Sequence, residues 1–443
     1  MDIDHQQIDL IRKSKSYIEK SKQKGLDTSC FANSFFVVAD QPSYFILKYF
    51  IYGKNSLLHK FYIFLKSLYS ITNLSNYKIY NDKKANNFIK IVVTWSKGND
   101  FEKDGSYNDR YFKVNSKKDK QILWFLISLD SKFPRNLNEN IIVLFKEDKE
   151  KKSFFYLIKT IFINLFRFKF SISKFLASLS FYPHFSEIIF KKIKPLLFRN
   201  NFKKIVIPYE SQPFQNYLFK NIKKHKQSIE TVGYMHSSQP FPIHNLFRDG
   251  SPEKLLVHGS DQKFHLINYL GWPDEVIKLI PSMRFKKKDK LEIQNKILLP
   301  YHISNSEIYL QEFEKLLLSL DKKIKPLTIV NHPHKMNSNI HLRLEKKLNH
   351  LLELHKNIFS ADSQQSEILI FGPSYVIIEA LERGLEFTHI CAEPILESYS
   401  ETFWPNISVM KTNNYVFKYS LKNFGACVNL SVENNIFHKY CVG

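Results

Sequence analysis

A short apolar run recurs along the chain and ends each time in a polar or Gly/Pro-containing turn. The runs are rich in Val and Ile and do not alternate with polar residues, which is typical of strands buried on both faces of a parallel sheet. Helix-like stretches lie between many of them, so we predict an α/β fold with parallel sheets covered by helices. The runs are residues 89–95, 141–145, 204–207, 231–234, 255–257, 297–299, 327–330, 368–371 and 387–391, and two of the helix-like stretches are residues 309–320 and 342–355.

The runs fall into two groups, which predicts two domains. The 443 residues are enough for two domains of ordinary size. We place an N-terminal domain at residues 1–250 and a C-terminal domain at residues 251–443. Segment 271–290 is rich in Pro and Lys and is expected to link the two sheets, and the last ~20 residues, 424–443, are candidates to pack back on the first domain.

The formal net charge of +23 predicts anionic partners. No zinc-ligand spacing, RNA-binding signature or single basic helix is present, so an anionic membrane surface and phosphate-bearing substrates are favoured over nucleic acid. The four cysteines show no CxxC spacing, which favours neither disulfides nor a zinc site. The first residues lack an apolar segment, and no apolar run reaches the ~18–20 residues of a spanning helix. A cytoplasmic protein is expected.

Residues 151–190 form an aromatic and basic stretch that departs from this pattern. Four basic residues fall within one half of a helical projection and leave a broad aromatic face opposite. This arrangement suits an amphipathic element in an anionic lipid interface. The alternative is a pair of core helices whose lysines extend to the surface. The four residues are Lys159, Arg167, Lys169 and Lys174.

Polar side chains follow the apolar runs directly. In open parallel sheets, ligands bind at the carboxyl ends of the strands, where the loops converge. Each of these residues alone could be a cap or a turn residue, but together they outline a cleft. They are Glu210, His236, His302, His332, Ser374 and Glu393.

Two segments of the second half predict a phosphate site. Pro333 biases His332 toward an extended conformation, which aims the imidazole toward the cleft. About forty residues later, IFGPSYVIIEALERG predicts a strand, a turn and a helix. Ser374 would lie near the start of that helix, where free amides favour a phosphate, or would only cap it. Further ligand-binding candidates in the segment are Gly372, Tyr375 and Glu379, and Glu379 could face a ribose.

The pairing of the His-Pro turn with the later strand–Ser–helix segment is similar to bacterial GT-B transferases that use CMP-activated acidic sugars. These include bacterial sialyltransferases and the Kdo transferases of capsule assembly. The resemblance implies two Rossmann-like domains whose parallel sheets face each other across a cleft. It also implies that His332 and Ser374 bind the cytidine nucleotide. Pro373-Ser374 stands where two serines are usual in those families.

Two more segments resemble surface-carbohydrate biosynthesis proteins. These proteins carry a Tyr-Glu-x-Gln stretch followed by Gly-Tyr-x-His-Ser, which is similar to YESQPFQNYLFKNIKKHKQSIETVGYMHSSQP in this chain. The first-domain loop of the same family is similar to TWSKGNDFEKDGSYNDRYF. Asp104-Gly105 resembles the acidic-acidic-Gly motif that supplies the catalytic base of bacterial sialyltransferases, although Lys103 replaces its first acid. Glu210 is the rival base. Asp109 and Arg110 are expected to anchor the loop as an ion pair.

The resemblance implies a metal-independent glycosyltransferase. It would move an acidic sugar of the sialic acid, nonulosonate or Kdo type from a CMP-sugar to a cell-surface glycan or lipid-linked acceptor. His236 would bind the donor, and neither a cofactor nor a metal is expected, because no internal DxD pair is present. The enzyme would lie on the inner face of the cytoplasmic membrane. The alternatives are a CDP-glycerol or CDP-ribitol phosphotransferase of the teichoic-acid type, and a non-catalytic membrane-associated scaffold of glycan assembly.

Overall fold

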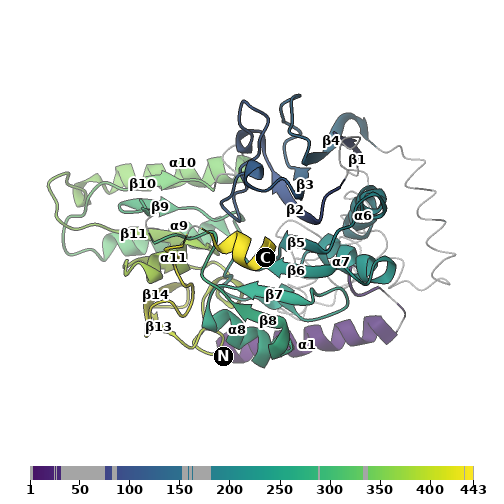
Figure 1. The fold of residues 1–443 in the computed structure, drawn as a ribbon. Coiled ribbons are helices and arrows are strands. Elements are labelled where there is room, and N and C mark those ends of the chain that lie inside the picture. The colour runs from purple at the N-terminus through teal and green to yellow at the C-terminus, as the bar shows by residue number, and fades with distance from the viewer. Residues whose placement is uncertain are drawn as a thin grey trace.

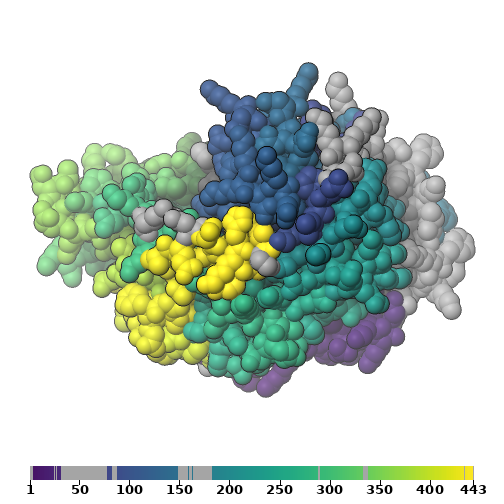
Figure 2. Space-filling view, in the orientation of Figure 1, coloured from purple at the N-terminus to yellow at the C-terminus, as the bar shows by residue number. Residues whose placement is uncertain are grey.

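The chain has a mixed α/β fold with two mostly parallel sheets. The computed structural model describes residues 3–23, 25, 27–30, 75–81, 87–151, 158, 162, 181–287, 290–332, 338–433 and 435–442. Figure 1 shows the first sheet in blue and teal and the second in green beside it. In the space-filling view the residues of the second sheet form a lobe that projects from the larger first one (Figure 2).

The first sheet has the strand order β1-β4-β3-β2-β5-β6-β7-β8. Every neighbouring pair is parallel except β1 and β4. If the six strands β2 to β7 are numbered 1 to 6 along the chain, their order across the sheet is 3-2-1-4-5-6. This is the strand order of a doubly wound sheet. The order reverses between β2 and β5, where ligands bind in such sheets. The strands are β1 (Ser75–Tyr80), β2 (Lys90–Ser96), β3 (Ile122–Ser128), β4 (Ile141–Lys151), β5 (Lys204–Pro208), β6 (Glu230–Tyr234), β7 (Lys254–Val257) and β8 (Ile277–Leu279).

The second sheet has the order β10-β9-β11-β12-β14-β13. The first four strands are parallel, and the β13–β14 hairpin pairs antiparallel with β12. Here the order reverses between β9 and β11, so the carboxyl ends of these two strands mark the expected binding edge. The strands are β9 (Lys296–Leu298), β10 (Thr328–Val330), β11 (Ile368–Phe371), β12 (Thr388–Ile390), β13 (Ile407–Lys411) and β14 (Val416–Leu421).

Helices cover the sheets and begin where the sequence supplies caps. The Asn305 side chain accepts a hydrogen bond from the amide of Glu307 at the start of α9. In α7, the side chain of Gln215 accepts a hydrogen bond from the amide of Gln212 at 3.0 Å, and basic residues occupy the last turn. The α-helices are α1 (Ile3–Gln23), α6 (Phe181–Arg199), α7 (Pro213–His225), α8 (Ser260–Asn268), α9 (Ser306–Leu318), α10 (Asn339–Leu354), α11 (Val376–Glu382) and α12 (Pro394–Glu397). Single turns of 3₁₀ helix lie at Gly98–Asp100, Ser116–Lys118, Ile243–Asn245, Asp274–Val276 and Lys356–Ile358, and a π turn lies at His438–Val442.

The central strands of the first sheet are buried on both faces. All seven residues of β3 are buried. Alternate residues of β2 and β3 belong to different apolar clusters, as expected when successive side chains point to opposite faces. Ile91, Val93 and Phe125 pack in one cluster, and Val92 and Trp124 pack in the other. This two-sided burial explains why these runs are continuous rather than alternating.

The nine apolar runs are all strands, and both helix-like stretches are helices. The first sheet extends past the domain boundary predicted at residue 250. Strand β7 extends the parallel ladder from β6, and β8 then pairs with β7. The first sheet therefore reaches Leu279, and segment 271–290 contributes an edge strand before it leads to the second sheet.

Both ends of the chain tie the two halves together. The tail runs back over the first sheet, where Ile436 and Phe437 join its core and the amide of Asn429 donates to the carbonyl of His258 at 2.6 Å. In Figures 1 and 2 the tail, in yellow, lies between the two lobes. Helix α1 contacts the second half, because Gln7 donates to the carbonyl of Ile395 at 2.8 Å and Thr402 donates to Asp4 at 2.6 Å.

Most of the stretch predicted to contact membrane lies outside the described residues. All four of its basic residues, Lys159, Arg167, Lys169 and Lys174, also lie outside the described residues. The described part of the stretch is chiefly the start of α6. Across the described ranges, no helix is both long and apolar enough to cross a bilayer.

Candidate functional site

Glu210 and His236 form a polar pair at the carboxyl edge of the first sheet. Glu210 follows β5 and His236 follows the neighbouring parallel strand β6. The Nε2 atom of His236 lies 3.1 Å from Oε1 of Glu210, and the side chains are 5% and 24% exposed. Because the strand order reverses next to β5, the pair stands at the position where a doubly wound sheet binds ligands.

The loop that carries Glu210 is fixed from several sides. Gln212 donates to the second carboxylate oxygen of Glu210 at 2.9 Å, and the amide of Glu210 donates to Gln215 at 3.0 Å. Ser211 has a φ of 56°, a left-handed conformation uncommon for serine. Its carbonyl accepts a hydrogen bond at 2.7 Å from buried Arg248, which also donates to two other backbone carbonyls. The carboxylate is therefore held in place.

The environment keeps Glu210 ionised. Burial by itself raises the pKa of Glu210, but the charge and hydrogen bond of His236 and the hydrogen bond from Gln212 outweigh it and hold the pKa at about 2. The second ring nitrogen of His236, Nδ1, is buried and has no hydrogen-bond partner among the described residues. The ring of Tyr111 packs edge-on against the imidazole at 4.4 Å between centroids. Unsatisfied buried nitrogens are rare, and a bound hydroxyl would satisfy this one.

Side chains from the second sheet and from the linking segment contact the loop after β6, which carries His236. Gln239, which follows β6, donates to the hydroxyl of Tyr375 at 3.1 Å. Burial and the charge of Glu210 raise the pKa of Tyr375 to about 12, so the two side chains are electrostatically coupled. The guanidinium of Arg284 lies 5.6 Å from the centre of the Tyr375 ring and 3.5 Å from the carbonyl of His236. Carboxylate, imidazole, guanidinium and phenol thus meet between the sheets.

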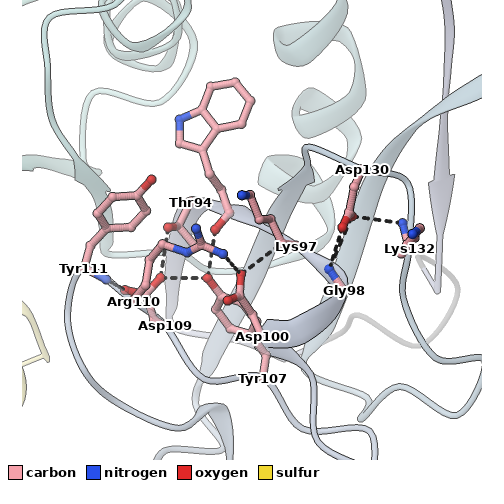
Figure 3. Close-up of polar contacts among 11 residues, drawn as sticks. Thr94, Lys97, Gly98, Asp100, Tyr107, Asp109, Arg110, Tyr111, Asp130 and Lys132 are labelled. Atoms are coloured by element: carbon pink, nitrogen blue, oxygen red, sulfur yellow. Dashed lines mark hydrogen bonds and ion pairs between the residues drawn. The ribbon is translucent and has the colours of Figure 1, made fainter. Parts of the chain in front are cut away.

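A second polar cluster stabilises the loop after β2 (Figure 3). Asp109 is buried and accepts hydrogen bonds from Thr94 and Tyr107 at 2.9 Å and from two backbone amides. The predicted ion pair between Asp109 and Arg110 is wrong. Arg110 pairs with Asp100, because hydroxyl and amide donors already enclose Asp109. Burial raises the pKa of Asp109 despite these hydrogen bonds.

Asp104 lies in an exposed turn of the same loop. Its side chain is 53% exposed and forms an ion pair with Lys117. The hydrogen bonds from Lys117 and Ser106 hold its pKa at about 2. The turn requires Gly105, whose φ is 80° and whose added Cβ would lie 1.8 Å from the carbonyl oxygen of Asn136. Among the described residues, no contact joins Asp104 to Glu210 or His236.

The predicted donor residues follow the parallel strands of the second sheet. His332 follows β10 and Ser374 follows β11, with β9 between them. The two residues therefore share one edge, but their strands are about 10 Å apart. His332 packs edge-on against Tyr301, which follows β9, at 5.3 Å between ring centroids. Ser374 lies at the β9–β11 reversal, and His332 lies one strand outside it.

The remaining predicted residues of this edge have local roles in the structure. Gly372 has a φ of 58°, and its added Cβ would lie 2.5 Å from the hydroxyl of Tyr309. The hydroxyl of Ser374 accepts a hydrogen bond from the amide of Val376 at 3.4 Å. This contact agrees with the alternative prediction that Ser374 caps the helix. Glu379 pairs with Arg383 at 2.8 Å, so its role toward a ribose stays a prediction. Pro333 lies outside the described residues.

Sequence reasoning missed three residues of the site, namely Arg284, Tyr111 and Gln239. Arg284 had a signal, because it is an arginine in an otherwise lysine-rich segment, and arginine is favoured for paired contacts to phosphate and carboxylate. Tyr111 and Gln239 had none. The described part of the chain contains no group of three or more His, Cys, Asp or Glu side chains arranged to hold a metal ion.

The sequence was also compared with known proteins. No protein-family model matches it. No curated protein is significantly similar to it.

Proposed function

We propose that the protein is a glycosyltransferase of the GT-B type that transfers an acidic sugar from a CMP-sugar to a cell-surface glycan or lipid-linked acceptor. The main support is the pairing of Glu210 with His236 at the reversal point of the first sheet, opposite Tyr375 and beside Arg284. Such a site offers a proton acceptor and a cation to one reaction centre. It would work at the inner face of the cytoplasmic membrane.

The proton acceptor is the Glu210–His236 pair. Nδ1 of His236 takes the proton of the acceptor hydroxyl, whose oxygen bonds to the anomeric carbon as the bond from that carbon to the phosphate oxygen breaks. Glu210 accepts a hydrogen bond from Nε2 and stabilises the imidazolium, as the carboxylate of a Ser-His-Asp triad does. Asp104, the other predicted base, is less suited because it is exposed and paired with Lys117.

The CMP leaving group lies against the second sheet. Arg284 neutralises the charge that develops on the phosphate, and Tyr375 positions it. The turn of Gly372 and Ser374 and the side chain of His332 hold the nucleotide along the same edge. A sugar linked through a monophosphate develops less charge on leaving than one linked through a diphosphate. The site is therefore proposed to work without a metal ion.

The test is a thermal-shift and calorimetric screen with CMP, CDP, UDP, GDP and ADP. CMP at about 100 times its dissociation constant should stabilise the fold by about 2.7 kcal/mol, and the other nucleotides should do less. Arg284→Ala should weaken CMP binding about tenfold, whereas Arg343→Ala, an exposed arginine on α10, should not. Equal stabilisation by all nucleotides, or none, would overturn the proposal. Transfer of the polyol phosphate from CDP-glycerol or CDP-ribitol to an acceptor, a reaction that also releases CMP, would replace it with the phosphotransferase alternative.

A further inference from the structure

An open cavity of about 450 Å³ lies outside the residues assigned to the proposed reaction. It is bounded by the loop after β2 and by the segment that links the two sheets. Lys113, Lys118 and Lys286 line it, and we call it the lysine cavity. The cavity and the site draw on the same two segments of the chain, because Lys113 is two residues from Tyr111 and Lys286 is two residues from Arg284.

The described lining of the lysine cavity carries more positive than negative charge, with three lysines and one acid. None of its three lysines forms an ion pair with a described residue, whereas the neighbouring Lys117 pairs with Asp104. The acid in the wall is Asp109, whose carboxylate already accepts four hydrogen bonds from within its own loop and from Thr94. Three ammonium groups without an ion pair among the described residues attract an anion from solution.

The backbone fixes where the three lysines stand. Lys113 has a φ of 54°, and the Asp109 amide donates to the Val114 carbonyl at 2.8 Å across that turn. Lys118 ends a 3₁₀ turn that Asn115 caps. The carbonyl of Lys286 accepts a hydrogen bond from Arg383 at 3.0 Å. The three cations therefore come from three separately anchored points around one opening.

Building on the proposed function, we infer that the lysine cavity binds a phosphate or diphosphate group carried by the acceptor. Lysine ammonium groups act as point charges toward phosphate, and three of them match the charge of a diphosphate. The volume lies within the range of small-molecule sites, about 300–1,000 Å³. Asn108 and Asn115, which hydrogen-bond each other at 2.8 Å, add a polar wall. An acceptor held here by its phosphate would present a sugar hydroxyl toward His236.

The experiment is calorimetric titration of the full chain with inorganic pyrophosphate at 150 mM salt, the probe for the cavity, and separately with CMP, the probe for the donor site. The test variant carries Lys113→Gln, Lys118→Gln and Lys286→Gln. The matched control carries Lys322→Gln, Lys323→Gln and Lys346→Gln, which removes the same charge from exposed positions of the second half. The wild type and the control should bind pyrophosphate alike, and the test variant at least tenfold more weakly. CMP affinity should be equal in all three proteins.

Pyrophosphate binding that is absent in the wild type, unchanged in the test variant or equally weakened in the control would overturn the inference. In each of these cases the CMP titration still tests the proposed function separately. A water-soluble short-chain prenyl diphosphate identifies the source of the phosphate. Binding at least tenfold tighter than pyrophosphate, lost in the test variant, supports a lipid-linked acceptor. Equal affinity supports a phosphate on a soluble acceptor.

Discussion

The loops that carry Glu210 and Asp104 both hold a carboxylate whose pKa is about 2, yet they achieve it differently. Glu210 is largely enclosed, and its charge is stabilised by His236 and Gln212 against the cost of burial. Asp104 is half exposed, and hydrogen bonds from a surface lysine and from the side chain and amide of Ser106 lower its pKa. The charge of Glu210 is largely enclosed by the protein, whereas that of Asp104 faces solvent.

This difference shows that a lowered pKa alone does not distinguish an enclosed carboxylate from an exposed one. Exposed ion pairs are screened by water and salt and contribute little. The electrostatic interaction between a carboxylate and a buried imidazole is strong, because water is excluded. It can stabilise the imidazolium that forms when the imidazole takes a proton from substrate. We therefore propose Glu210, rather than Asp104, as the carboxylate that assists proton transfer.

The largest difference is expected in catalysis. Glu210→Gln removes the charge that stabilises a protonated His236, so kcat for sugar transfer from the cognate CMP-sugar should fall about 10²- to 10⁴-fold. Asp104→Asn should change kcat less than about threefold, because a surface ion pair contributes little. Steady-state kinetics of both variants measures this. A large loss in Asp104→Asn with a small loss in Glu210→Gln would reverse the assignment.

A smaller difference is expected in stability, through the arginine that holds each loop. Arg248→Met leaves three buried carbonyls without a donor and should lower the free energy of unfolding by about 4 kcal/mol. Arg110→Met removes only a partly exposed pair with Asp100 and should cost about 1 kcal/mol. Urea denaturation of the two variants gives both values. Equal losses would show that the Glu210 loop is not specially fixed.

The smallest difference is expected in the pH dependence of stability. The pKa of Glu210 is lower in the folded protein than its ordinary value of 4.5, so the folded protein binds fewer protons there than the unfolded one. Its stabilisation of about 3 kcal/mol is present above pH 4.5 and is lost as the pH falls toward 2. Glu210→Gln should flatten the stability curve in this window at low and high salt alike. Asp104→Asn should flatten it only slightly, and less in high salt.

The sequence predicts the sheets well, because buried parallel strands leave a direct trace in apolar runs. The runs at residues 204–207 and 231–234 became β5 and β6, and the residues that follow them became the paired Glu210 and His236. Strand β3 was missed even though residues 122–128 are almost wholly apolar. Strand β8 was missed because its edge position leaves two of its three residues exposed.

Contacts between distant segments left no comparable trace. The neighbourhood of Arg284 and Tyr375 depends on how the two sheets meet, and the contact of Tyr111 with His236 depends on a turn far away in the chain. The charge of Arg110 was evident, but its partner was not, because Asp109 is satisfied by hydroxyl and amide donors and Asp100 is not adjacent in sequence. Pairing of this kind is set by packing rather than by local pattern.

The central claim is that the edges of the two sheets form one site, in which the nucleotide lies along the second sheet and its phosphate reaches the loop after β6. Hydrogen–deuterium exchange of the wild-type protein with and without saturating CMP tests it most directly. Binding should slow exchange together at residues 234–239 and 372–376, while residues 102–106 around Asp104 remain unchanged. Protection confined to one sheet, or centred on residues 102–106, would contradict the account.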